Sequence, residues 1–154
     1  MSKFVAGDKA PVFEGVNQKG KKISLNDFKG KKLILYFYPK DDTPGCTAES
    51  CNLNDNYEMW LKKGFEVVGV SPDNEKSHLK FIEKYGLKFN LISDTNNEIL
   101  EMYGAWGEKS MYGKKYMGVL RTTYVIDENG IIREVFEKVD TKNHTSQIIE
   151  ALNI

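Results

Sequence analysis

Short apolar blocks alternate with longer amphipathic stretches along most of this chain. Two blocks, 31–38 (KKLILYFY) and 65–70 (FEVVGV), are rich in β-branched and aromatic residues, which is typical of buried strands. Between them, 43–63 has the length of a helix; it opens on Thr-Pro, a good N-cap and first helical residue, and a glycine follows it. Two buried strands joined by a helix form a βαβ unit, so we expect parallel strands with a right-handed crossover.

The rest of the pattern predicts elements on both sides of this unit. Residues 12–16 and 21–25 flank Asn-Gln-Lys-Gly and predict an N-terminal β-hairpin. Residues 120–126 and 131–137 flank Asp-Glu-Asn-Gly, whose Asn-Gly pair predicts a second hairpin. The remaining expected elements are helices at 74–85, 97–103 and 144–152, a short strand at 89–92 and a long surface loop at 104–118.

The order of these elements predicts the fold class. Strands that alternate with helices, followed by a late hairpin, indicate an α/β fold with a central mixed β-sheet flanked by helices. The chain has no internal repeat, low-complexity tract or linker-like segment. We therefore expect a single domain over residues 1–154.

Charge and hydropathy exclude several kinds of partner. Lys+Arg and Asp+Glu both number 22, so the formal net charge is zero, and we expect no nucleic-acid and no anionic-membrane partner. No stretch approaches the ~20 apolar residues that span a bilayer, and charged residues interrupt the N-terminal segment where a signal peptide would be apolar. We expect a cytoplasmic protein, whose thiols are kept reduced.

The chain has two cysteines, Cys46 and Cys51, which are too few for a disulfide framework or an all-cysteine zinc site. The two histidines, His78 and His144, lie far along the chain and form no ligand-spaced cluster with them. We expect both histidines to be solvated. The sequence therefore predicts no metal site and no cofactor.

Cys46 falls in the first turn of the predicted helix, directly after a buried parallel strand. Unpaired backbone N–H groups and the positive end of the helix dipole collect there, and they favour a thiolate over a thiol. Gly45 permits a close approach to the sulfur, and the Thr43 hydroxyl can cap the helix, donate to the thiolate or a substrate oxygen, or do both. The alternative is that Cys46 is only a small buried apolar residue.

The segment around Cys46 resembles the active site of the peroxiredoxins. The resemblance rests on the spacing Pro39-xxx-Thr43-xx-Cys46, in a strand–loop–helix context. The nearby Cys51 is similar to the subgroup called bacterioferritin comigratory proteins, or peroxiredoxin Q. The likeness extends from Gly-Asp-Lys-Ala-Pro at 7–11 to Arg-Thr-Thr at 121–123, and so covers nearly the whole chain.

The resemblance implies a thioredoxin-like fold and a specific reaction. Cys46 would be the peroxidatic thiolate that attacks a peroxide, Thr43 would hydrogen-bond the substrate oxygens, and Pro39 would shield the pocket. Arg121 would stabilise both the thiolate and the peroxide. Cys51 would resolve the Cys46 sulfenic acid as an intramolecular disulfide, which thioredoxin or a similar dithiol protein would reduce. The subgroup also implies a monomer.

Arg121 and Glu49 have some support from the residues themselves. Arg121 and Arg133 are the two arginines among 22 basic residues, and Arg121 lies on a predicted internal strand, where a planar fork can contact two acceptors. The alternative for Arg121 is an ion pair at a strand end. Glu49, one turn after Cys46, can orient Arg121 in a substrate site together with Gly45, or it can be a solvated carboxylate on the helix face.

Helix geometry separates the two cysteines. Five residues along an intact helix place the Cys46 and Cys51 Cα atoms about 8.7 Å apart, whereas a disulfide needs them within ~6.8 Å. We therefore expect oxidation to unwind the first turns of this helix, whose residues include several poor helix formers. The alternative is that Cys51 is an idle thiol.

Two other functions compete with a peroxidase. A thiol-disulfide oxidoreductase of the thioredoxin type shares the cysteine at the helix start, but this chain lacks the Cys-x-x-Cys that such chemistry normally uses. A non-enzymatic redox sensor would show the disulfide but would turn over poorly. Rapid consumption of peroxide distinguishes the peroxidase from both.

Overall fold

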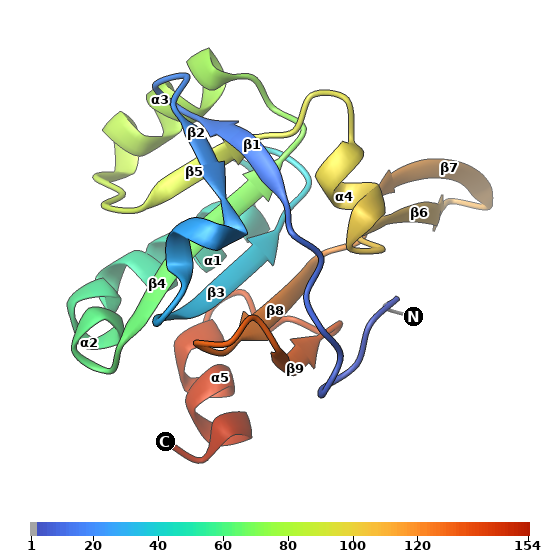
Figure 1. Cartoon of the computed structure of the whole chain (residues 1–154). Helices are drawn as coiled ribbons and strands as arrows, with labels where there is room; N and C mark the ends of the chain where they lie inside the picture. The colour runs from blue at the N-terminus through green and yellow to red at the C-terminus, as the bar shows by residue number, and fades with distance from the viewer. Residues whose placement is uncertain (1–2) are drawn as a thin grey trace.

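The computed structural model describes residues 3–154 and places a seven-stranded mixed sheet at the centre of that part of the chain (Figure 1). In sheet order its strands are β2 (Lys22–Ser24), β1 (Glu14–Asn17), β5 (Asn90–Ser93), β4 (Phe65–Ser71), β3 (Lys32–Phe37), β8 (Thr122–Ile126) and β9 (Ile132–Phe136). Strands β3, β4 and β5 are parallel to one another, and the other neighbours pair antiparallel. The predicted parallel pair, the N-terminal hairpin and the late hairpin are all confirmed.

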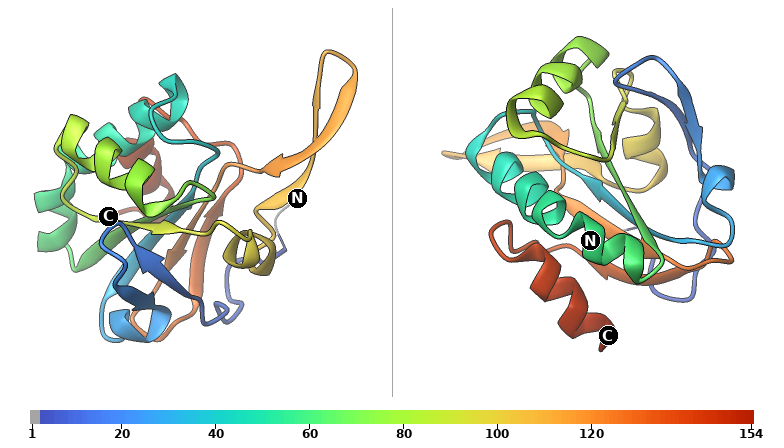
Figure 2. Two further views of the ribbon diagram at one scale, coloured as in Figure 1. Left: turned by 90° about the horizontal axis from the view of Figure 1, so that it is seen from above. Right: turned by 90° about the vertical axis from the view of Figure 1, so that its left-hand side faces the viewer.

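Helices cover both faces of the sheet. They are the 3₁₀ helix η1 (Leu25–Phe28) and the α-helices α1 (Pro44–Asp55), α2 (Tyr57–Lys62), α3 (Glu75–Tyr85), α4 (Glu98–Met102) and α5 (His144–Leu152). Side chains of α1, α2, α3 and α5 pack in one core cluster, and those of η1 and α4 pack in the other (Figure 2). Successive β3 side chains enter the two clusters alternately, as the period of a strand requires.

The helix predicted over 43–63 is two helices. Asn56 interrupts it with φ −109° and ψ 12°, and its side-chain amide donates to the carbonyl of Asn52 at 2.8 Å. Asn54, Asp55 and Asn56 follow one another here, and residues of this type compete for backbone hydrogen bonds and disfavour helix interiors. The expectation of one continuous helix is therefore wrong.

The loop predicted at 104–118 is a β-hairpin. Strands β6 (Trp106–Met111) and β7 (Lys114–Val119) pair antiparallel as a separate two-stranded sheet, which extends away from the rest of the protein (Figure 2). The turn residues Tyr112 and Gly113 have φ +53° and +78°, the signs that a two-residue type I′ turn requires. We call residues 106–119 the arm.

The predicted exposure of the histidines is also wrong. His78 in α3 and His144 at the start of α5 are both fully buried, and each makes hydrogen bonds through both ring nitrogens. Within residues 3–154, no helix combines the length and apolarity needed to cross a membrane.

Candidate active site

Cys46 lies in the first turn of α1, beyond the carboxyl end of β3 (Figure 1). Thr43 is the N-cap, with extended backbone, and its carbonyl accepts from the amide of Thr47 at 2.8 Å. The Cys46 side chain is 1% exposed. The helix start thus lies where open α/β sheets place their sites, and Cys46 belongs to the first turn, whose backbone N–H groups lack helical partners.

Arg121 is the positive charge next to the sulfur. It directly precedes β8, which pairs with β3 and so brings residues 75 positions apart into contact. Its Nη2 donates to Cys46 Sγ at 3.4 Å, and its Nη1 donates to Glu49 Oε1 at 2.7 Å. The guanidinium therefore bridges the thiol and a buried carboxylate, which confirms that Glu49 contacts Arg121 and excludes a solvated Glu49.

Gly45 makes room for this bridge. A Cβ at position 45 would lie 3.2 Å from Arg121 Nη2, closer than most Cβ contacts in proteins. The Gly45 backbone has no unusual φ, so the lack of a side chain is what matters here. A side chain at position 45 would require the guanidinium to shift by a few tenths of an ångström.

Glu49 has an unusual environment behind Arg121. Its side chain is fully buried, and burial raises its pKa to about 7 even though Arg121 and Thr123 act in the opposite direction. His144 Nε2 lies 3.7 Å from Glu49 Oε2 and 2.9 Å from Thr123 Oγ1. Burial lowers the pKa of His144 to about 4. His144 could not be predicted as part of this site from the sequence, because no local spacing connects α5 with Cys46.

Thr43 and Pro39 lie on the loop that leads into the helix. The Thr43 side chain makes no capping hydrogen bond; its hydroxyl donates to the carbonyl of Lys40 at 2.8 Å. Thr43 is therefore the N-cap residue as predicted, but the alternative in which its hydroxyl caps the helix is not what the structure shows. Pro39 is half-buried directly after the last core residue of the strand segment, Tyr38.

Cys51 is on the same intact helix and is not bonded to Cys46. It is half-buried, and desolvation together with the nearby Asp55 carboxylate raises the pKa of its thiol above the ordinary value. The helix separates the two cysteines as the sequence predicted.

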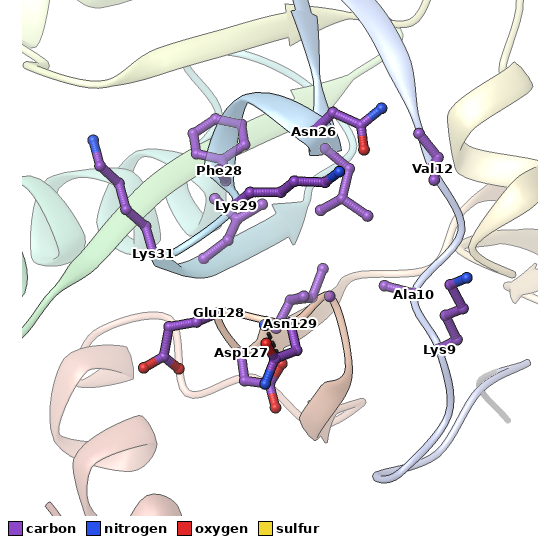
Figure 3. A pocket seen from close by; sticks show the side chains of 14 residues that line it. Lys9, Ala10, Val12, Asn26, Phe28, Lys29, Lys31, Asp127, Glu128 and Asn129 are labelled. Carbon is purple, nitrogen blue, oxygen red and sulfur yellow. Dashed lines mark hydrogen bonds between the residues drawn. The ribbon is translucent and has the colours of Figure 1, made fainter.

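A separate pocket of about 500 Å³ lies at the opposite end of β3 (Figure 3). Leu33 at the start of β3, Phe28 of η1 and the turn between β8 and β9 line it, together with the N-terminal segment. Lys9 and Lys31 lie on opposite sides of it in Figure 3. No residue of the Cys46 site lines this pocket.

The chain belongs to the AhpC/TSA family, whose profile matches residues 6–135. Among curated proteins it is 41% identical to the peroxiredoxin Bcp of Escherichia coli, over 99% of this chain and 97% of that protein. It is 47% identical to a Coxiella burnetii relative that carries the peroxiredoxin bcp name, over 95% of this chain and 97% of that protein. The chain is therefore similar over its whole length to peroxiredoxins, which reduce peroxides with a thiol.

Solved structures also show the similarity to peroxiredoxins. A serine variant of the Xylella fastidiosa PrxQ superposes with a TM-score of 0.89 at 30% identity, covering 96% of this chain and 94% of that one. The Xanthomonas campestris bacterioferritin comigratory protein, described for alkyl peroxide reduction, has a TM-score of 0.86 at 31% identity, covering 95% and 98%. The expected fold, a central mixed sheet flanked by helices as in thioredoxin-like peroxiredoxins, is confirmed.

Proposed function

We propose that this protein reduces hydroperoxides through Cys46 and that Cys51 resolves the oxidised sulfur. The observation that carries this assignment is the bridge from Glu49 through Arg121 to Cys46 at the start of α1. A permanent cation in contact with the sulfur, at the positive end of a helix, stabilises the thiolate that the reaction needs.

The first step is a two-electron transfer from sulfur to peroxide. The Cys46 thiolate attacks the terminal oxygen, an S–O bond forms and the O–O bond breaks. The hydroperoxide proton passes to the leaving oxygen, which departs as water or an alcohol, and Cys46 is left as a sulfenate. The sulfenate takes up a proton from water to give the sulfenic acid. Charge develops on both oxygens during this step, so a guanidinium already held in place lowers the barrier.

Each neighbouring residue has a distinct part in this step. Arg121 faces the sulfur and the peroxide oxygens, and Glu49 holds Arg121 in orientation from the buried side. Gly45 leaves space for the guanidinium. Thr43 is assigned to the substrate oxygens and Pro39 to shielding the sulfur; their places on the loop before the helix support both roles.

The second step requires α1 to change shape. The Cys51 sulfur attacks the Cys46 sulfenic acid, an S–S bond forms and water leaves. About 8.7 Å between the Cα atoms on an intact helix is too long for that bond, so the first turns must unwind. While α1 is folded, the raised pKa of Cys51 keeps it a thiol, and unwinding exposes it to water where it ionises more readily.

A dithiol protein of the thioredoxin type completes the cycle by reducing the disulfide. The peroxiredoxin relatives support a peroxide substrate and a thiol reductant. The identity of the reductant as thioredoxin, the monomeric state, the cytoplasmic location and the single domain over 1–154 stay predictions.

Stopped-flow peroxide reduction tests the assignment. Wild type should consume hydrogen peroxide repeatedly when thioredoxin and its reductase are supplied. Cys46→Ser should lose all turnover, whereas Cys51→Ser should react once and accumulate the sulfenic acid. Full turnover by Cys46→Ser, or a wild type that reduces protein disulfides but not peroxide, would exclude the proposed mechanism.

A further inference from the structure

Asp41, in the loop between β3 and α1, is a buried carboxylate with donors on both oxygens. Its Oδ1 accepts from the Tyr38 hydroxyl at 2.6 Å. Its Oδ2 accepts from Ser77 Oγ at 2.8 Å and lies 2.7 Å from His78 Nδ1. Both Ser77 and His78 belong to α3, so the loop before Cys46 is attached to a helix more than 30 residues further along the chain.

His78 forms a buried hydrogen-bonded pair with Asp41. Its Nε2 lies 3.0 Å from the carbonyl oxygen of Ile92 in β5. A carbonyl oxygen can only accept, so Nε2 carries a proton. The 2.7 Å contact between His78 Nδ1 and Asp41 Oδ2 then requires one further proton between these two atoms, so both ring nitrogens take part in hydrogen bonds. The side chains of His78 and Asp41 are 0% and 4% exposed, so water does not compete for this pair.

The backbone of Asp41 is fixed as well. Its amide donates to Asp73 Oδ2 at 2.7 Å, and Ser71 Oγ donates to the same oxygen at 2.8 Å. Ligand atoms of Asp41, Asp73 and His78 lie within 4.8 Å of one another. Since each of these side chains already takes part in hydrogen bonds, the cluster is accounted for by an internal network.

The next loop residue, Asp42, is held from the same helix. Lys84 Nζ and the Tyr85 hydroxyl donate to its two carboxylate oxygens at 2.7 and 2.6 Å. Its φ is +58°, an unfavourable backbone conformation that persists only where contacts maintain it. Two consecutive loop residues are therefore attached to α3, one through buried contacts and one through exposed contacts.

We propose that Asp41 and His78 are positioning residues that form a clamp between the active-site loop and α3. The clamp holds the loop in place before the reaction, so that Cys46 and Thr43 are aligned for the peroxide. It also stays closed when α1 unwinds, so that unwinding begins after Asp42 and does not spread into the loop. This inference rests on the proposed function of Cys46 and Cys51.

The structure gives a reason why the clamp stays closed when α1 unwinds. Separating Asp41 from His78 would leave buried polar groups without hydrogen-bond partners, which is costly. The first turn of α1, by contrast, contains Gly45 and Thr47, which are weak helix formers, and its N-cap side chain makes no capping bond. When oxidation drives a local rearrangement, the helix turn therefore unfolds before the buried Asp41–His78 pair separates.

Single-turnover kinetics and amide hydrogen exchange test the clamp. The variants are Asp41→Asn, His78→Gln and the double variant. The matched control is Asp94→Asn, because Asp94 is also a buried carboxylate but binds the α4 amides of Ile99 and Leu100. Thermal unfolding identifies the folded variants, and His78→Gln carries the test if Asp41→Asn does not fold.

We expect each clamp variant to oxidise Cys46 about tenfold more slowly, since small misplacements of reacting groups are costly. The Asp41 amide should exchange faster in these variants, and the control should match wild type in both measurements. The double variant should be no slower than the slower single variant, because the two residues act as one unit. In oxidised wild type, amides 46–51 should lose protection while the Asp41 amide keeps it.

Three results would overturn the clamp: unchanged oxidation rates in folded variants, losses that multiply in the double variant, or an Asp41 amide that opens together with Cys46 on oxidation. These results differ from a failure of the proposed function. In that case wild type itself would not react with peroxide, whatever the state of Asp41 and His78.

Discussion

Side chains around Cys46 are arranged so that one guanidinium donates hydrogen bonds to two partners. The same Arg121 head group donates to a sulfur through one nitrogen and to Glu49 through another, and the absence of a side chain at Gly45 lets it approach. A planar guanidinium presents several donors in fixed directions and so makes both contacts at once. A compact ammonium at this position would keep the charge but lose one of the contacts.

Replacing Arg121 by lysine should therefore slow the reaction with peroxide about a hundredfold, by analogy with the loss of a preorganised donor in other active sites. The second-order rate constant from stopped-flow fluorescence measures this effect. Arg133→Lys is the matched control, since Arg133 is an exposed residue of β9. Equal losses in the two variants would show that the arginine geometry at position 121 is unimportant.

Glu49 and His144 give the stability of the protein opposite dependences on pH. The pKa of Glu49 is raised from 4.5 to about 7, so the stability it contributes is present below pH 4.5 and is lost as the pH rises through 7. The pKa of His144 is lowered from 6.5 to about 4, so its contribution is present above pH 6.5 and is lost as the pH falls through 4. The two effects oppose each other between about pH 4.5 and 6.5.

Substitutions should separate the two effects. His144→Gln should lose about 3 kcal/mol of unfolding free energy between pH 4.5 and 7, because Glu49 then acts alone. Glu49→Gln should instead gain stability as the pH rises from 4 to 6.5. Urea unfolding followed by tryptophan fluorescence at a series of pH values measures both. A flat profile for His144→Gln would contradict the environment assigned to Glu49.

For single residues, the sequence predicted those roles that depend on the spacing of nearby residues. Cys46, Gly45 and Thr43 could be assigned to one helix start from consecutive residues. Arg121 was found through the resemblance and its scarcity, and the structure brings it to the sulfur. The buried roles of His78 and His144 could not be predicted, because they depend on contacts between α3, α5 and the sheet that no short-range pattern encodes.

Among the helices and strands, α1 both positions Cys46 and has limited stability of its own. Its first turn holds Cys46, and Asn56 separates it from α2, so it is a short helix that can open by itself. Helices of this length depend on tertiary packing more than on intrinsic propensity. The fold of α1 should therefore control the rate of disulfide formation without controlling the first chemical step.

Thr47→Ala tests that separation. Alanine favours a helix over threonine by about 0.6 kcal/mol, so disulfide formation should slow about two- to threefold while oxidation of Cys46 is unchanged. The two phases are resolved in one stopped-flow trace. Ser146→Ala, at an exposed position of α5, is the control and should change neither phase. A Thr47→Ala protein that forms the disulfide at the wild-type rate would show that unwinding does not limit this step.

The sequence predicted most strands and helices because their apolar faces are buried. It missed the arm because little of the arm is buried beyond its base, where Trp106 and Val119 pack against the core. Met111, Tyr112 and Met117 are 56%, 98% and 57% exposed, so β6 and β7 lack the alternation that marks a half-buried strand. Their turn is also unusual, since Tyr112 occupies a positive-φ position where asparagine is typical. Strand propensity alone therefore did not predict strands in the arm.

On the scale of the whole molecule, the arm is separate from the sheet that carries the active site. The combined change Tyr112→Asn and Met117→Ser should therefore alter the free energy of unfolding by less than about 0.5 kcal/mol. It should also leave peroxide reduction unchanged. Chemical denaturation and stopped-flow kinetics check both expectations. A loss of stability above about 1 kcal/mol would show that the arm packs against the body of the protein in solution.

The interruption at Asn56 has a consequence for the lifetime of the protein. Trp60 of α2 is fully buried and its indole N–H donates to Thr145, so the chain is anchored immediately beyond the segment that opens. A protease that meets the oxidised molecule would therefore find the opened turns of α1 cleavable, whereas the reduced molecule keeps them folded. Each reduction by the partner closes these turns again, so the supply of reductant protects the enzyme from degradation as well as restoring its activity.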